Sequence, residues 1–205
     1  QPTGQTCTVT ANTGLVFSAN VTTVAVTCST ITYTIGGTVS GLTAAGLVLR
    51  NNGGDDLTVS SGAATFTFST KIASGAGYSV TVLTQPTGLT CTVSAPSGTV
   101  AAANVTSVSV ACSVSTYSIG GTISGLTGSG LVLQNNGGDN LTAAPGGYAF
   151  ATKLAHGSTY NVTVLTQPTS PAQICTVANP SGTATAAVTN ANVTCVNAYT
   201  IGGTI

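Results

Sequence analysis

The sequence predicts an all-β protein built from tandem β-sandwich modules, and three observations carry this prediction. The chain repeats itself, so that Leu57 and Leu141 occupy the same place in two copies that lie 84 residues apart. Short segments rich in β-branched residues alternate with Gly, Asn, Ser and Pro clusters at intervals of about ten residues. The six cysteines fall two to a repeat. No segment shows convincing helical periodicity.

The repeat is visible in strings of nearly identical residues. YTIGGT begins at Tyr33 and again at Tyr199, with YSIGGT at Tyr117 between them. Segment 46–58, GLVLRNNGGDDLT, returns as GLVLQNNGGDNLT at 130–142. We therefore expect four parts: the C-terminal part of a repeat at residues 1–32, complete repeats at 33–116 and 117–198, and the first strand of a further repeat at 199–205.

This division predicts that the sequence is a stretch of a longer array. The absence of an initiator Met and of a leader then carries no information about targeting. The spacing between copies changes from 84 residues at Leu57 and Leu141 to 82 at Lys71 and Lys153. Such changes mark small insertions or deletions, which belong in turns.

Seven strands are expected in the complete repeat 33–116, each supported by alternation of apolar and polar residues. The first two place Ile, Val or Leu at alternate positions, and the third follows the turn residues NNGG, whose Asn and Gly tolerate positive φ. The fourth alternates Phe with Thr, and the fifth alternates Val with Ser or Thr. The last two alternate Thr or Ser with Cys and Val. Their ranges are 33–40, 46–51, 55–60, 64–70, 77–84, 90–94 and 105–113.

The alternation also predicts which side chains form the core, because successive strand residues point to opposite faces. Phe66 and Phe68 are expected to point inward, and so are Val108 and Val110. Thr and Ser should cover the exterior, where the β-branched Thr side chain suits a pleated strand and its hydroxyl stays hydrated.

The cysteines are expected to form one disulfide in each repeat. The first Cys of a repeat opens the sixth strand and the second closes the seventh, so an antiparallel hairpin of these strands would bring the sulfurs together. A zinc site is the alternative, but there is no Cys-x-x-Cys and only one His. Disulfides imply an oxidising location outside the cytosol. The expected pairs are Cys7–Cys28, Cys91–Cys112 and Cys175–Cys195.

The composition excludes several classes of function. Charged residues are 3% of the chain, with three Lys+Arg, three Asp+Glu and a formal net charge of zero. A nucleic-acid partner is not expected, because such proteins need a basic surface to displace phosphate counterions. No apolar run reaches the roughly 18 residues of a membrane helix, so no membrane span is expected.

Taken together, the motifs IGGTVSGL, GLVLxNNGGDxLT, YxVTVLTQP and CTV resemble a tandem immunoglobulin-like repeat of bacterial cell-surface and secreted proteins. The resemblance covers the whole chain in register. It implies immunoglobulin-like sandwich domains of about 84 residues and an extracellular or cell-surface location. Modules of this kind serve as stalks, spacers, and adhesive or filament-forming arrays, so the resemblance does not choose among these roles. It brings no catalytic residues.

No catalytic residue, metal-ligand set, cofactor or binding residue is predicted, and we expect no enzyme. His156 corresponds to Ser74 of the preceding repeat and is interpreted as a solvated turn residue. Asp55, Asp56 and Asp139 could offer oxygen ligands to Ca²⁺. Asn140 stands where the other copy has Asp56, so a polar hairpin tip is the favoured interpretation.

Other candidate sites are weaker. Lys71 and Lys153 could form isopeptide bonds, but the chain has no Glu to promote them. The abundant Thr suggests an ice- or sugar-binding surface, but the chain has no Trp, and flat Thr arrays usually come from much shorter repeats. Asn-x-Thr sequons matter only if the source glycosylates. They lie at Asn20, Asn104, Asn140, Asn161 and Asn192.

These observations predict a structural extracellular protein whose repeats form a semi-rigid rod that self-associates into surface filaments, with other copies of the chain as the partner. An almost uncharged surface lacks the repulsion that keeps strand edges apart. One alternative is the stalk or spacer of a bacterial surface adhesin. A second alternative is a module that binds a glycan or a host protein.

Overall fold

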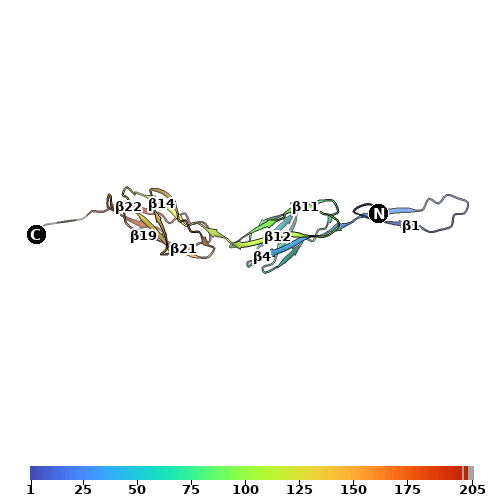
Figure 1. Ribbon diagram of the computed structural model, residues 1–205, viewed down its shortest axis with the longest axis horizontal. Helices are drawn as coiled ribbons and strands as arrows, with labels where there is room; N and C mark the ends of the chain where they lie inside the picture. The colour runs from blue at the N-terminus through green and yellow to red at the C-terminus, as the bar shows by residue number, and fades with distance from the viewer. Residues whose placement is uncertain (200, 203–205) are drawn as a thin grey trace. The chain divides into compact units, whose positions relative to one another are not determined.

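The computed structural model describes residues 1–199 and 201–202, and every regular element in them is a β-strand. The chain divides into two compact units, Gln1–Ser113 and Val114–Ile205 (Figure 1). The expected strand at 199–205 falls mostly on residues outside the described ones, and Tyr199, Ile201 and Gly202 are not in a strand.

The first unit holds two four-stranded sheets and two short two-stranded ones. The four-stranded sheets have the orders β10-β12-β4-β7 and β11-β9-β5-β6, while β1 pairs with β2 and β3 with β8. The strands are β1 Gln5–Thr10, β2 Ala25–Thr30, β3 Thr32–Tyr33, β4 Ile35–Ser40, β5 Leu47–Asn51, β6 Asp55–Val59, β7 Thr65–Thr67, β8 Ile72–Ala73, β9 Gly77–Thr84, β10 Leu89–Ser94, β11 Ser97–Thr99 and β12 Val105–Val114.

The second unit repeats this arrangement with sheets of order β17-β14-β22-β20 and β16-β15-β19-β21, and β13 pairs with β18. Its strands are β13 Thr116–Tyr117, β14 Gly120–Ser124, β15 Val132–Asn135, β16 Asp139–Thr142, β17 Gly146–Ala149, β18 Leu154–Ala155, β19 Thr159–Thr166, β20 Gln173–Val177, β21 Ser181–Thr183 and β22 Val193–Asn197.

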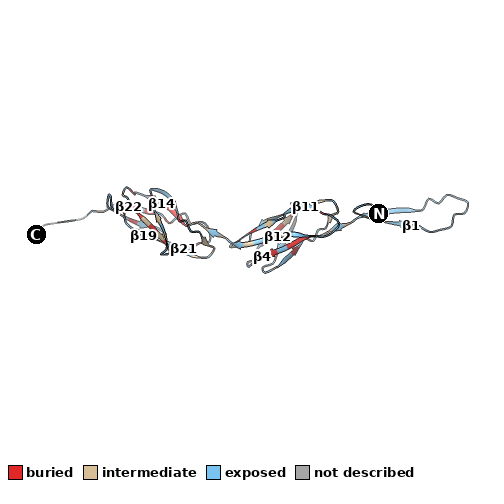
Figure 2. Cartoon of the chain, in the orientation of Figure 1, coloured by how far each residue is buried: buried red, intermediate tan, exposed pale blue. Residues whose placement is uncertain are grey.

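Each pair of four-stranded sheets encloses one apolar core, so the prediction of an all-β, sandwich-like fold is confirmed. The core of the first unit includes Phe66, Phe68, Val108 and Val110, the residues whose inward direction the alternation predicted. Buried residues lie within the two sandwiches, whereas β1 and β2 contain none (Figure 2).

A parallel pairing completes one sheet of each sandwich. The late strand β12 runs parallel to β4, and β22 runs parallel to β14. The double glycine of IGGT permits this close approach, because a β-carbon at Gly37 would overlap the carbonyl oxygen of Val108. A β-carbon at Gly121 would meet the carbonyl oxygen of Ala191 in the same way.

Candidate functional site: strand edges and exposed faces

Three disulfides join the cysteines. Cys7–Cys28 links β1 to β2, Cys91–Cys112 links β10 to β12, and Cys175–Cys195 links β20 to β22. In β20 and β22, Cys175 lies directly opposite Cys195, with 4.0 Å between their Cα atoms. This short separation is typical of a non-hydrogen-bonded antiparallel pair, whose main-chain groups point away from the partner strand. Three such bonds indicate a protein that matures outside the cytosol.

A glutamine side chain binds these outward-pointing main-chain groups. Nε2 of Gln85 donates to the carbonyl oxygen of Cys91 at 2.9 Å, and the Cys91 N–H donates to Oε1 of Gln85 at 2.7 Å. Gln167 makes the same two bonds to Cys175, at 3.1 and 2.7 Å. Gln1 does so with Cys7. The amide therefore takes the place of a neighbouring strand at one residue of the edge.

These glutamines were not predicted from the sequence. The available signal was the return of QPT shortly before each first cysteine, six residues ahead of Cys7 and Cys91 and eight ahead of Cys175. The segment between Gln167 and Cys175 is two residues longer than its counterparts in the other copies. It forms a local turn in which Thr169 and Ala172 pair as an isolated β-bridge. The glutamine contact thus persists through an insertion, which indicates that the contact belongs to the repeat.

The NNGG turns use their two asparagines differently. Asn51 is buried, and its Oδ1 accepts the Ser79 N–H at 3.1 Å. Asn52 has φ 49° and its side chain donates to the carbonyl oxygen of Gly77. Asn135 and Asn136 repeat both roles in the second unit. These turns therefore tie the β5–β6 and β15–β16 hairpins to β9 and β19.

Two acidic residues of these turns, Asp56 and Asp139, accept hydrogen bonds of the fold, whereas Oδ2 of Asp55 is buried without a hydrogen-bond partner. Nε of Arg50 lies 2.6 Å from Asp56 Oδ1, and the hydrogen bond from Arg50 holds the pKa of Asp56 below its usual value. Gln134 and Asn140 form the equivalent uncharged pair at 2.7 Å. Asp139 Oδ2 accepts the Thr152 N–H at 3.0 Å. Within residues 1–199 and 201–202, no three His, Cys, Asp or Glu side chains gather as metal ligands.

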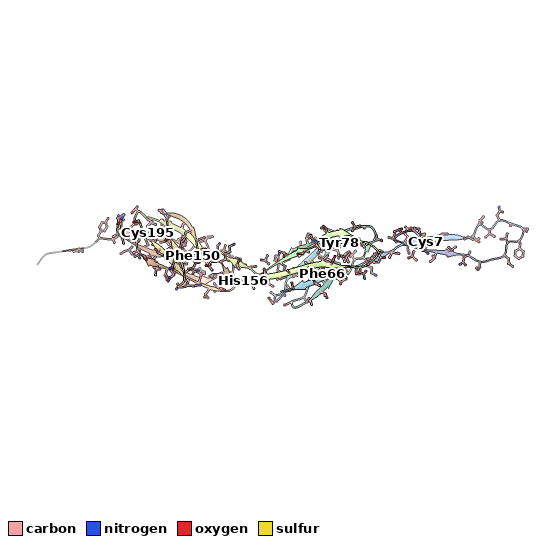
Figure 3. All side chains as sticks on the ribbon, viewed as in Figure 1. Cys7, Phe66, Tyr78, Phe150, His156 and Cys195 are labelled. Carbon is pink, nitrogen blue, oxygen red and sulfur yellow. A yellow bond between two sulfur atoms is a disulfide. The ribbon has the colours of Figure 1, made fainter. Side chains whose placement is uncertain are left out.

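His156 lies in a turn, as expected, but its side chain is only partly solvated, because the residue is half-buried and its Nδ1 atom is buried without a hydrogen-bond partner. The main chain of His156 is bonded to the fold. Its N–H donates to the carbonyl oxygen of Ser115 at 2.8 Å, as the N–H of Ser74 donates to Ile31 at 2.9 Å. The imidazole ring of His156, which is labelled in Figure 3, packs against Tyr117, with 5.9 Å between the ring centroids. The main-chain hydrogen bond at this position is therefore made by Ser74 in one copy and by His156 in the other. The ring contact with Tyr117 occurs only in the second copy.

The remaining candidate residues lie on the surface. Lys71 and Lys153 are exposed, and so are the five sequon asparagines Asn20, Asn104, Asn140, Asn161 and Asn192. The side chains of three of these asparagines also bind the fold. Asn104 Oδ1 accepts the Thr34 N–H and Asn192 Oδ1 accepts the Thr122 N–H, both at 3.0 Å, and Asn140 Oδ1 accepts from Gln134 Nε2 at 2.7 Å.

The β1–β2 hairpin exposes apolar side chains that its counterpart in the sandwich buries. Val24 and Val26 are 51% and 64% exposed, whereas Val108 and Val110, at the same places in the next copy, are fully buried. Cys28 and Cys112 hold the same position in the two copies, which fixes the alignment. The hairpin therefore has an apolar face without the strands that would cover it.

No helix in the described part of the chain is long and apolar enough to cross a membrane. A scan of the sequence against protein-family models gives no match, and no curated protein matches it. The two sandwiches share exposed strand edges, repeated Thr-rich faces and a scarcity of charge.

Proposed function

We propose that the chain belongs to a structural extracellular protein whose immunoglobulin-like modules form a semi-rigid rod and self-associate into surface filaments. One observation carries the proposal: two copies of the same sandwich repeat an exterior of exposed Thr and Ser with almost no charge. Proteins that must stay apart usually protect their strand edges with Lys, Glu and net charge.

The few charges offer little repulsion between copies. Arg50 and Asp56 neutralise each other across β5 and β6. The equivalent pair in the second unit, Gln134 and Asn140, carries no charge at all. Thr and Asn side chains exchange hydrogen bonds with water for hydrogen bonds with a neighbour at a lower desolvation penalty than ions do. Contact between such surfaces is therefore tolerated, and it should depend little on salt.

The short connection between modules supports the rod. β12 ends at Val114 and β13 begins at Thr116, so one residue separates the two strands. Ser115 does not serve as a free linker, because its carbonyl oxygen accepts the N–H of His156. A connection without Gly or Pro that is hydrogen bonded to a module limits bending.

Electron microscopy of the protein at neutral pH tests this proposal. We expect ordered fibres with lateral contacts between chains, and these should persist in about 0.5 M salt and at about pH 4. Fibres that dissolve under either condition would contradict assembly through uncharged surfaces.

Two alternatives give different images or measurements. Isolated threads one module wide would favour the stalk of a surface adhesin, in which the modules only project another domain. Thermal stabilisation of the chain by a particular glycan or host protein would favour a binding module. Dispersed single chains at every concentration would exclude the filament.

A further inference from the structure

The β1–β2 hairpin lacks a strand that both sandwiches have beside the equivalent strand. Cys28, Cys112 and Cys195 hold the same place in three copies of the repeat, so β2 corresponds to β12 and β22. β12 is paired on both sides, by β10 and by β4, and β22 is paired by β20 and by β14. In the part of the chain that the structure describes, β2 pairs with β1 alone. One edge of β2 is therefore free where both counterparts are occupied.

This free edge differs from the other strand edges of the molecule. β10, β7, β11 and β6 end the sheets of the first sandwich, and their counterparts β20, β17, β21 and β16 end the sheets of the second. For these edges the repeat offers no example of a partner strand. For the free edge of β2 it offers two, because β4 pairs with β12 and β14 pairs with β22, both in parallel.

The chain carries a third copy of the pairing strand. β4 lies in the string YTIGGT that begins at Tyr33, and the same six residues begin again at Tyr199. Tyr199 is 87% exposed and Ile201 is fully exposed. Ile35 and Ile119, which hold the place of Ile201 in the other copies, are fully buried. The chain therefore holds both an edge without its strand and a segment, residues 199–205, with the sequence of that strand.

The pairing of β4 with β12 predicts the register of a contact between this segment and β2. The observed pairs include Ile35–Val105, Gly37–Val108 and Val39–Val110. Their counterparts are Ile201–Val21, Gly203–Val24 and Ile205–Val26. Gly203 and Ile205 lie outside the described residues, so their places follow from the sequence. The three valines of the hairpin are each more than half exposed, so the contact would remove apolar surface from water on both partners.

Gly203 is the residue on which close pairing depends. A β-carbon at Gly37 would overlap the main chain of β12, so glycine lets β4 come close to that strand. A β-carbon at Gly36 would instead meet the main chain of β7, on the other side of β4. Gly203 has the place of Gly37, and Gly202 has the place of Gly36. Of these two glycines of the segment, Gly203 would therefore be the one that approaches β2.

We propose that residues 199–205 of one copy add as a parallel strand to the free edge of β2 in a second copy. The inference rests on the proposed self-association and specifies its contact. Each copy gives a strand at one place and receives a strand at another, so the contact is heterologous and repeats from copy to copy. Main-chain hydrogen bonds hold an added strand of this kind, and the fit of its side chains selects it. One strand does not complete a sandwich, so each contact is weaker than the core of a module.

The first experiment compares the two glycines of the donated strand. Gly203→Val places a β-carbon toward β2, and the matched control Gly202→Val places one on the opposite side of the strand. Sedimentation of the full chain over a concentration series gives the concentration at which half the protein assembles. We expect Gly203→Val to raise it about tenfold or more and Gly202→Val to change it less than about twofold, because main-chain hydrogen bonds to β2 need close approach on one side only. Equal effects, or a larger effect of the control, would overturn the pairing.

The second experiment tests whether the contact runs from the donated strand of one copy to the hairpin of another. Ile201→Asp alters the donated strand and leaves β2 intact, whereas Val26→Asp alters β2 and leaves the donated strand intact. Both residues are more than half exposed, so neither change places a charge in a sandwich core. Each variant alone should stay monomeric. An equimolar mixture should form pairs and nothing longer, because only one of the two contacts of each chain remains.

A two-fold contact between two hairpins gives a different result. Val26→Asp would then prevent assembly and Ile201→Asp would not, and that result would overturn the addition of residues 199–205. A mixture that stays monomeric, like its two components, would overturn it as well, since the mixture retains one intact donated strand and one intact β2 edge.

The outcomes separate this inference from the proposed function. A wild-type chain that stays monomeric at every concentration overturns the filament together with the strand addition. A wild type that assembles, with Gly203→Val assembling equally well, overturns only the strand addition. Calorimetry of every variant shows whether the two sandwiches unfold as in wild type. If Gly203→Val alters these transitions, Ile201→Asp replaces it in the same comparison of assembling concentrations.

Discussion

Tyr148 donates its phenol hydrogen to the main-chain oxygen of Ala191, joining β17 to the segment before β22. Phe66 stands at the corresponding place in the other unit and has no hydroxyl. Both rings pack edge to face against the next inward aromatic residue, with 5.8 Å between centroids for Phe66 and Phe68 and for Tyr148 and Phe150. The two units therefore share the aromatic contact, and one of them adds a hydrogen bond to it.

Replacing this phenol should cost about the value of one hydrogen bond. We expect Tyr148→Phe to lower the free energy of unfolding by about 1 kcal/mol, because the ring still packs but the Ala191 oxygen loses a donor. Urea unfolding measures the change. The control is Tyr199→Phe, at a residue that is 87% exposed, and it should change nothing. An equal loss in both variants would contradict the assigned bond.

The titration of the Tyr148 phenol should change the stability of the protein at alkaline pH. Burial raises the pKa of Tyr148 to about 12 from its ordinary value of 10.0. The unfolded chain therefore releases this proton at lower pH than the folded chain does, so stability is full below about pH 10 and falls as pH rises towards 12. We expect the loss between these values to be smaller in Tyr148→Phe than in wild type. Parallel stability curves for the two proteins would show that the phenol does not titrate in this way.

The alternation of apolar and polar residues predicted the core strands, but it did not predict which strands pair with one another. Phe66, Phe68, Val108 and Val110 are buried as the pattern predicts, because side-chain direction follows from the period of a strand. The parallel pairing of β4 with β12 joins residues 70 positions apart, such as Ile35 and Val105. Alternation determines which face is buried, but it does not determine which strands pair.

Elements with little apolar content escaped the prediction. β11 has the sequence SGT and no buried residue, so no hydrophobic pattern marks it. β3 and β8 have two residues each, too few to show a period. The glutamines were missed for another reason: Gln85 binds the main chain of Cys91, and such a contact depends on turn geometry that no residue period encodes.

The disulfides should differ in what they stabilise. Cys91→Ala/Cys112→Ala should lower the free energy of unfolding of its sandwich by about 3 kcal/mol, the value expected for a loop of about 20 residues. Cys7→Ala/Cys28→Ala should leave the sandwich transitions unchanged, because that bond lies in a hairpin whose apolar residues are exposed. Differential scanning calorimetry of both variants checks this. A comparable loss in both would mean that the hairpin and the sandwich unfold together.

The two asparagines of the NNGG turn should respond differently to substitution. Asn51→Ala should cost about 1–3 kcal/mol, because it leaves the Ser79 N–H without its acceptor in a buried site. Asn52→Gly should be nearly neutral, since glycine adopts the positive φ of this position without strain. Chemical denaturation of both variants measures the difference. If Asn52→Gly proved the more damaging, the side-chain bond to Gly77 would outweigh the buried one.

The β1–β2 hairpin should fold into a third sandwich when strands equivalent to β4–β9 are placed ahead of it. A copy of residues 33–84 fused ahead of Gln1 supplies strands equivalent to β4–β9. These should cover Val24 and Val26 as β4 and its neighbours cover Val108 and Val110. We expect an additional calorimetric enthalpy of about 50 kcal/mol near 60 °C, the amount typical of some 80 newly ordered residues.

The substitution Val26→Asp, made in both the fused and the unfused chain, provides the control. Val26→Asp should abolish the added transition in the fused chain, because it buries an unpaired carboxylate in the new core. In the unfused chain the same change should have almost no effect on the sandwich transitions, since Val26 is 64% exposed there. An added enthalpy that survives Val26→Asp would mean that the fused strands fold without the hairpin. No added enthalpy at all would show that the hairpin sequence, despite its match to β10–β12, does not complete a sandwich.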